Sequence, residues 1–229
     1  MRKMEKNQKR IETERLILRP LTLEDASAVF EWAGDPLVNK YMPYPLHKSV
    51  AQAEEWIRSL GEKNEFCFCL KNSGKVMGAG SVVYDEQYAA YELGYNLNRA
   101  YWGQGYATEA ARALIGWAHQ TLGARDFFAR HANANGASGN VLKKCGFQFQ
   151  CYGQYARYDG SMFEASYYTL HLGELPEVSS RKNGAHHLER RAFQWGYHNF
   201  PKTKGLARLN GKEKRREILH LSSFYWCAK

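Results

Sequence analysis

Residues 102–110 read WGQGYATEA, so two glycines separated by one glutamine stand directly before a run of strong helix formers. Gly103 and Gly105 permit positive φ values and a close backbone approach that a β-carbon would forbid. The amides of residues 104–108 would then form the first turn of a helix, which lacks intrahelical partners and attracts negative charge. This pattern favours an anion site, although a plain tight turn from strand to helix would use the same residues.

The letters around this turn exclude two familiar phosphate-binding motifs. A dinucleotide-binding fold has a third glycine and an acidic residue about 20 positions later, and a P-loop has Gly-Lys-Ser or Gly-Lys-Thr. Neither pattern is present. The preceding strand also belongs to a run of three successive strands, whereas parallel nucleotide-binding folds alternate strands with helices. The turn therefore predicts an anion site of another kind.

Helices and strands can be assigned around the turn. Strands are expected at 15–22, 66–70, 76–84, 89–97, 125–131, 147–158 and 162–172. Helices are expected at 23–33, 50–60, 106–121 and 137–144. Capping boxes at Thr22 with Asp25 and at Ser49 with Gln52 open the first two helices. This order predicts an α/β domain with a mixed sheet over residues 11–173, a polar leader over 1–10 and a basic tail over 174–229.

The net charge of +9 is concentrated in the tail. Residues 174–229 hold 12 Lys or Arg against 5 Asp or Glu, and residues 1–173 hold 20 against 18. The body is nearly neutral, so any contact with a polyanion has to be made by the tail. The segments KTKGLARLNGK and KEKRRE could contact phosphates there, which leaves a ribosome- or nucleic-acid-binding protein as the alternative function.

Membrane, secretory and metal-binding classes are not favoured. No apolar run approaches the roughly 18 residues that span a bilayer, and the charged N-terminus lacks the apolar region of a signal peptide, so we expect a cytoplasmic protein. The five cysteines include no C-x-x-C pair. Cys67 and Cys69 alternate with phenylalanine in FCFC, which predicts packing on one face of a strand rather than metal or redox chemistry.

Two motifs together carry a family resemblance. The run YELGYNLNRAYWGQGYATEAARALIGWA (91–118), followed by NGASGNVLKKCGF (135–147), resembles the GNAT superfamily of acetyl-CoA-dependent N-acetyltransferases. The first run is similar to the coenzyme motif Q/R-x-x-G-x-G/A, with Trp102 where Gln or Arg is usual. The second is similar to the signature N-x-x-S-x-x-v-L-x-K-x-G-F of the branch that acetylates the N-terminal alanine or serine of ribosomal proteins.

The resemblance implies a mostly antiparallel sheet, flanked by helices, whose fourth and fifth strands splay apart at residues 89–97 and 125–131. It implies direct acetyl transfer from acetyl-CoA to an amine, with no acetyl-enzyme. The backbone amides of Gln104, Gly105, Tyr106, Ala107 and Thr108 would bind the diphosphate. The pantetheine arm would pair with backbone near Leu97, whose amide would face the developing oxyanion. Asn135 would hydrogen-bond the arm, although it could instead be an ordinary turn residue.

The resemblance also directs attention to catalytic side chains. Glu92 lies among apolar neighbours, which raise a carboxyl pKa, so it could accept a proton from the substrate ammonium. Glu164 is the second candidate, and a glutamate paired with a lysine or facing solvent is the alternative. Ser138 would lie near the coenzyme sulfur, although it could instead cap the following helix. Tyr152 and Tyr158 are alternative acids.

These motifs do not identify the amine that accepts the acetyl group. Peptide N-termini, polyamines, aminoglycosides and amino acids are acetylated by similar folds, and residues 35–49 with the last strands would decide among them. The loop at 35–49 carries Tyr41, Met42 and Tyr44, which suit a cleft lining or simple packing over the sheet. A monomer and a homodimer are both compatible with the sequence.

Overall fold

A computed structural model describes residues 9–61 and 63–174 of the 229-residue chain. The expected leader at 1–10 and basic tail at 174–229 therefore lie almost entirely outside the described residues. Within them, no helix combines the length and apolar character needed to cross a membrane.

The strands are β1 (Ile11–Glu12), β2 (Leu16–Pro20), β3 (Glu65–Leu70), β4 (Val76–Asp85), β5 (Ala90–Leu97), β6 (Asp126–Ala132), β7 (Gln148–Ala156) and β8 (Met162–His171). The helices are α1 (Ala26–Ala33), α2 (Pro36–Asn39), α3 (Val50–Ser59), α4 (Tyr106–Leu122) and α5 (Gly136–Lys144), with short 3-10 turns η2 (Leu23–Asp25) and η3 (Arg99–Tyr101).

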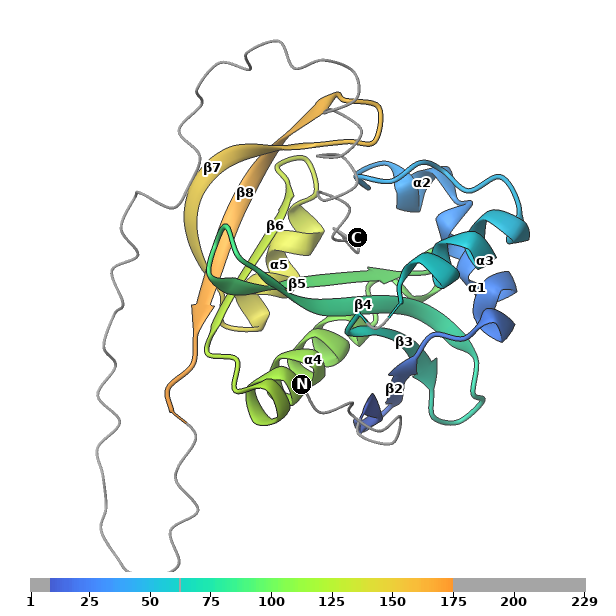
Figure 1. Ribbon diagram of the computed structural model, residues 1–229, viewed down its shortest axis with the longest axis horizontal. Helices are drawn as coiled ribbons and strands as arrows, with labels where there is room; N and C mark the ends of the chain where they lie inside the picture. Colours follow the sequence, from blue (N-terminus) through green and yellow to red (C-terminus); the bar gives the residue numbers. More distant parts are fainter. Residues whose placement is uncertain (1–8, 62, 175–229) are drawn as a thin grey trace, which may run out of the picture.

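One eight-stranded sheet runs through the domain in the order β1-β2-β3-β4-β5-β6-β8-β7. All neighbouring strands are antiparallel except β5 and β6, which are parallel. Helices α1 and α3 cover one face of the sheet, and α4 and α5 lie on the other (Figure 1). The expected mixed, mostly antiparallel sheet flanked by helices is confirmed.

Every element expected from the sequence forms, with ends shifted by a few residues at most. The expected helix at 23–33 begins as the 3-10 turn η2 before it becomes α1. Two elements were missed because they are too short to show a periodic pattern: β1 has two residues and α2 has four. Since β1 adds one strand at the start, the expected fourth and fifth strands are β5 and β6.

Alternation along β3 builds a core on each face of the sheet. Phe66 and Phe68 point toward α4, where the Phe66 ring contacts the Trp117 ring edge-on at 4.9 Å between centroids. Cys67 and Cys69 point to the α1 and α3 side, and their sulfur atoms lie 3.6 Å apart. The expectation that both cysteines pack in the core is therefore confirmed.

A buried ion pair fixes the passage from β2 to α1. Arg19 donates from Nη1 and Nη2 to the two carboxylate oxygens of Asp25, each at 2.8 Å, and the Thr22 amide donates to Asp25 at 2.8 Å. Burial alone would raise the pKa of Asp25, but these hydrogen bonds outweigh it and hold the pKa below its usual value. The carboxylate thus closes the first turn of the helix.

Replacing Asp25 by Asn should lower the free energy of unfolding by about 2 kcal/mol at pH 7, because Arg19 loses a largely buried partner. A depressed pKa contributes stability above the unfolded-state value, and that contribution is lost as the pH falls through the folded-state value. The difference from wild type should therefore shrink below about pH 4. Urea titrations across pH measure it, with exposed neighbour Glu24→Gln as the control; an effect that does not change with pH would contradict the account.

Candidate functional site

The turn between β5 and α4 has the backbone that its glycines predict. Gly103 and Gly105 adopt φ values of +72° and +84°, in the left-handed region that favours glycine. Gly105 is the N-cap of α4 and has no side chain with which to cap the helix. The first intrahelical bond runs from the Glu109 amide to the Gly105 carbonyl at 3.1 Å. The amides of residues 106–108 precede it, so they have no carbonyl one turn earlier in α4 to bind.

The end of β5 presents backbone groups toward β6. The Asn98 amide donates to the Met77 carbonyl of β4 at 2.8 Å, and hydrogen-bonding direction alternates along an antiparallel pair. The amides of Leu97 and Tyr95 therefore point away from β4. The indole nitrogen of Trp102 donates to the Leu97 carbonyl at 3.0 Å, which holds the end of the strand in place.

Strands β5 and β6 are joined over two residue pairs only, Tyr91 with Phe127 and Glu92 with Phe128. Beyond Glu92 no further pairing between these strands occurs in the described part of the chain. The expected parting of the sheet is confirmed, and it begins directly after Glu92. The outward-facing amides of Tyr95 and Leu97 border the opening.

Helix α5 approaches the opening from the β6 side. Asn135 is its N-cap and accepts from the Ser138 amide at 3.3 Å, so the interpretation of Ser138 as the cap is wrong. Ser138 lies inside the helix, 1% exposed, and its Oγ is 3.0 Å from the hydroxyl of Tyr95 on β5. The Tyr95 hydroxyl also donates to the Ser138 carbonyl at 3.1 Å. A strand and a helix on opposite sides of the opening are thereby linked.

Glu92 is buried and paired with an arginine. Its carboxylate lies 3.4 Å from Nε of Arg130 on β6, with both side chains more than nine-tenths buried. Arg130 also donates to the Tyr167 hydroxyl at 3.0 Å. Burial raises the pKa of Glu92 well above its ordinary value, and Arg130 offsets part of that rise. The alternative of a lysine-paired or solvent-facing glutamate is wrong, since the partner is Arg130.

A second buried carboxyl, Glu65 on β3, was missed from the sequence. It lies opposite Ser81 on β4, which lies opposite Gly94 on β5, so it shares a sheet face with Glu92. Neither carboxyl oxygen has a hydrogen-bond partner among the described residues, and burial raises the pKa to about 8. A lone charged residue opening the apolar strand EFCFCL was the available signal.

The loop at 35–49 lies over this same face. Met42 is fully buried, and the hydroxyl of Tyr44 accepts from the side-chain Nδ2 of Asn96 on β5 at 3.0 Å. The Tyr41 carbonyl accepts from the Tyr155 hydroxyl of β7 at 3.0 Å. The loop therefore bridges the two halves of the sheet beside the opening.

The remaining candidates are exposed. Glu164 on β8 is exposed and accepts a hydrogen bond from Gln154 on the neighbouring strand. Tyr152 and Tyr158 are 73% and 44% exposed. The tyrosine that lies against Ser138 is instead Tyr95, which the sequence did not single out.

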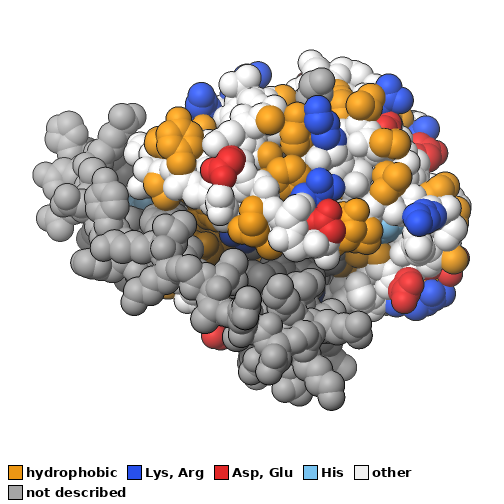
Figure 2. Space-filling model, turned by 90° about the horizontal axis from the view of Figure 1, so that it is seen from above, with side chains coloured by type: hydrophobic (Ala, Val, Ile, Leu, Met, Phe, Trp, Pro, Cys, Tyr) orange, Lys and Arg blue, Asp and Glu red, His pale blue; other side chains and the backbone are white. Residues whose placement is uncertain are grey.

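Charges on the described surface are mixed. On the face seen in Figure 2, Lys and Arg side chains lie among acidic and hydrophobic ones. Several surface cations are paired with acids: Arg10 with Glu12, Arg58 with Glu54, Lys75 with Glu31 and Arg99 with Asp35. The polyanion hypothesis therefore depends on the tail, of which the structure describes Glu174 alone.

Comparison with known proteins places this geometry in context. The family model of the acetyltransferase (GNAT) domain matches residues 15–148. The uncharacterized N-acetyltransferase p20 of Bacillus licheniformis is 34% identical over 143 residues, which cover 59% of this chain and 80% of p20.

Two solved structures share the fold. An acetyltransferase of the GNAT family from Bacillus anthracis aligns with a TM-score of 0.65 and 24% identity, covering 71% of this chain and 98% of its own. The microcin C7 self-immunity acetyltransferase MccE, solved in complex with acetyl-CoA and AMP, aligns with a TM-score of 0.60 and 19% identity, covering 70% and 94%.

Two glycines of the same helix should respond oppositely to alanine. At Gly105 the positive φ strains any side chain, so Gly105→Ala should lower the free energy of unfolding by about 1 kcal/mol. Gly116 lies inside α4, and a β-carbon there would contact nothing within 4 Å, so Gly116→Ala should raise it by up to about 1 kcal/mol. Equal changes of one sign in chemical denaturation would show that the left-handed turn is not rigidly held.

Proposed function

The chain belongs to the acetyltransferase (GNAT) domain family, and from that premise we propose that it acetylates a primary amine by direct transfer within a ternary complex. Family membership makes it an acetyl-CoA-dependent acetyltransferase. The observation that carries the proposal is the parting of β5 and β6 beside the uncapped start of α4.

The residues present fit the coenzyme. The amides of residues 104–108 surround a glycine-built helix start, which is suited to hold the diphosphate. The Leu97 amide faces the opening between the strands and would polarise the acetyl carbonyl. The side-chain oxygen of Asn135 already caps α5, which leaves its NH2 group to donate to the pantetheine arm. Bound acetyl-CoA supplies an activated thioester.

We assign proton removal from the amine to Glu92. It is the last residue of β5 paired with β6, and so stands where the opening begins. Its raised pKa makes its carboxylate a stronger base than an ordinary glutamate. Arg130 holds the carboxylate from the β6 side and limits the rise in its pKa.

We assign hydrogen bonding to the departing thiolate to Ser138. Its hydroxyl is buried beside β5, and the Tyr95 hydroxyl at 3.0 Å can pass on or accept a proton. A serine alone is a weak acid, and the tyrosine next to it supplies a second, more acidic hydroxyl in a buried network.

The electrostatics of the sheet face that carries Glu65 and Glu92 favour a singly charged amine as the acceptor. Glu92 is paired with Arg130, and Glu65, with a pKa of about 8, is mostly neutral at pH 7. A polyamine or an aminoglycoside would call for several ionised acids along the cleft. The N-terminus of a peptide carries one positive charge, so we propose a peptide N-terminus as the acceptor, consistent with the resemblance of residues 135–147 to the ribosomal-protein branch.

Replacing Glu92 by Gln should lower kcat about a hundredfold, because the base is removed while the coenzyme site is left intact. In the wild type, kcat/KM should rise with pH through a midpoint above the ordinary glutamate value, since the base has to lose its proton, and the variant should lack this rise. The control Glu164→Gln, which removes an exposed carboxylate, should stay within about twofold. A thiol-release assay across pH measures both variants. A larger loss of kcat in Glu164→Gln than in Glu92→Gln would assign the base to Glu164.

The acceptor is tested by the same thiol-release assay with a panel of amines. A peptide with free N-terminal serine should give the highest kcat/KM, ahead of spermidine and an aminoglycoside, because Glu65 is mostly neutral and Glu92 is paired with Arg130, which leaves neither to bind extra positive charges. The same peptide with a blocked N-terminus is the control and should release no thiol above background. Preference for a polycation would contradict the peptide acceptor while leaving acetyl transfer in place.

A further inference from the structure

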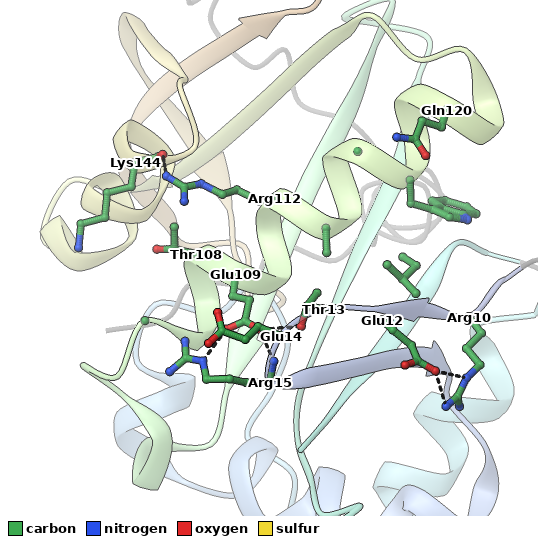
Figure 3. A pocket seen from close by; sticks show the side chains of 15 residues that line it. Arg10, Glu12, Thr13, Glu14, Arg15, Thr108, Glu109, Arg112, Gln120 and Lys144 are labelled. Carbon is green, nitrogen blue, oxygen red and sulfur yellow. Dashed lines mark hydrogen bonds and ion pairs between the residues drawn. The ribbon is translucent and has the colours of Figure 1, made fainter. Parts of the chain in front are cut away.

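The side chain of Arg15, just before β2, contacts the start of α4. Its Nε donates to Oε2 of Glu109 at 2.7 Å, and its own backbone amide donates to Oε1 at 2.9 Å. The Thr13 hydroxyl donates to the same Oε1 at 2.6 Å. Figure 3 shows Arg15 and Thr13 converging on Glu109 beneath the first turn of the helix. The guanidinium is therefore held in place by a carboxylate 94 residues away in the sequence.

The same guanidinium contacts the glycine turn itself. Nη1 donates to the Gln104 carbonyl at 3.0 Å, and the guanidinium carbon lies 4.2 Å from the centroid of the Tyr106 ring. Between them, a β-carbon added to Gly105 would lie 3.5 Å from Nη2. Arg15 thus contacts Gln104 and Tyr106 and lies beside Gly105, three consecutive residues whose amides are assigned to the diphosphate.

One end of the guanidinium remains available for a ligand. Nε and Nη1 have protein acceptors, whereas Nη2 has none within the described residues. The Arg15 side chain is 40% exposed and lines a groove of about 1010 Å³ that also contains Gly105, Thr108 and Arg112. The unused donors therefore lie in an open groove, at the helix start that favours an anion.

We propose that Arg15 is a further coenzyme-binding residue, which clamps the residue 104–106 turn and offers Nη2 to the diphosphate. The inference rests on the proposed coenzyme site. A guanidinium suits this task because its planar fork donates to several acceptors at once. Glu109 fixes the orientation through Nε and leaves the far edge of the fork facing the groove. The family's turn motif does not contain Arg15, which lies 89 residues before Gln104 in the sequence.

The test is the dissociation constant of coenzyme A, measured by calorimetry at low and high KCl on the full chain. Arg15→Met should raise it about tenfold at low salt, as expected for loss of a hydrogen bond between charged groups. The variant should also show a weaker dependence on salt, because one cation near the diphosphate is gone. Arg58→Met is the matched control, since Arg58 is an exposed arginine paired with Glu54 on α3, and it should bind as wild type does.

A second variant separates charge from clamping. Arg15→Lys keeps the cation but cannot reach Glu109, the turn and the ligand together, so it should bind more weakly than wild type with an unchanged salt dependence. An unchanged dissociation constant in Arg15→Met, or a rise with the wild-type salt dependence, would overturn the contact with the diphosphate. Failure of the wild type itself to bind coenzyme A would instead contradict the proposed coenzyme site and this inference with it.

Discussion

A parallel pair of strands that separates after two residue pairs leaves backbone amides and carbonyls without strand partners in the middle of a sheet. Buried backbone groups of this kind have to find other partners, since leaving them unsatisfied costs about as much as a lost hydrogen bond. In this chain the outward-facing groups belong to the end of β5, next to the glycine turn that starts α4. The strand end and the helix start lie close together in the chain, and both offer backbone donors.

The two halves of the sheet need other ties because their own ladder is so short. The Glu92–Arg130 pair crosses from β5 to β6 where the ladder ends, and Tyr95 with Ser138 links β5 to α5 farther along. The loop at 35–49 reaches both halves through Asn96 and Tyr155. Each tie lies at the edge of the opening. Two of these ties, Glu92–Arg130 and Tyr95–Ser138, contain the side chains to which we assign the chemistry.

Local signals in the sequence were sufficient to predict the glycine turn and most of the helices and strands. A positive φ at Gly103 and Gly105 and the length of α4 follow from residue types within a few positions. The partners of Glu92 and Ser138 could not be read in this way, since Arg130 is 38 residues away and Tyr95 is 43. Burial of Glu65 depends on packing from several elements. Residue type alone could not decide between Asn135 and Ser138 as the cap of α5, since both are good N-cap residues, and the structure places Asn135 there.

The arrangement is tested most directly by a crystal structure of the full chain with coenzyme A. The account predicts the diphosphate against the amides of residues 104–108, with Arg15 beside it. It also predicts the pantetheine arm between β5 and β6, running past the Leu97 amide. Coenzyme bound elsewhere, or β5 and β6 paired along their whole length with those amides satisfied by protein, would contradict it.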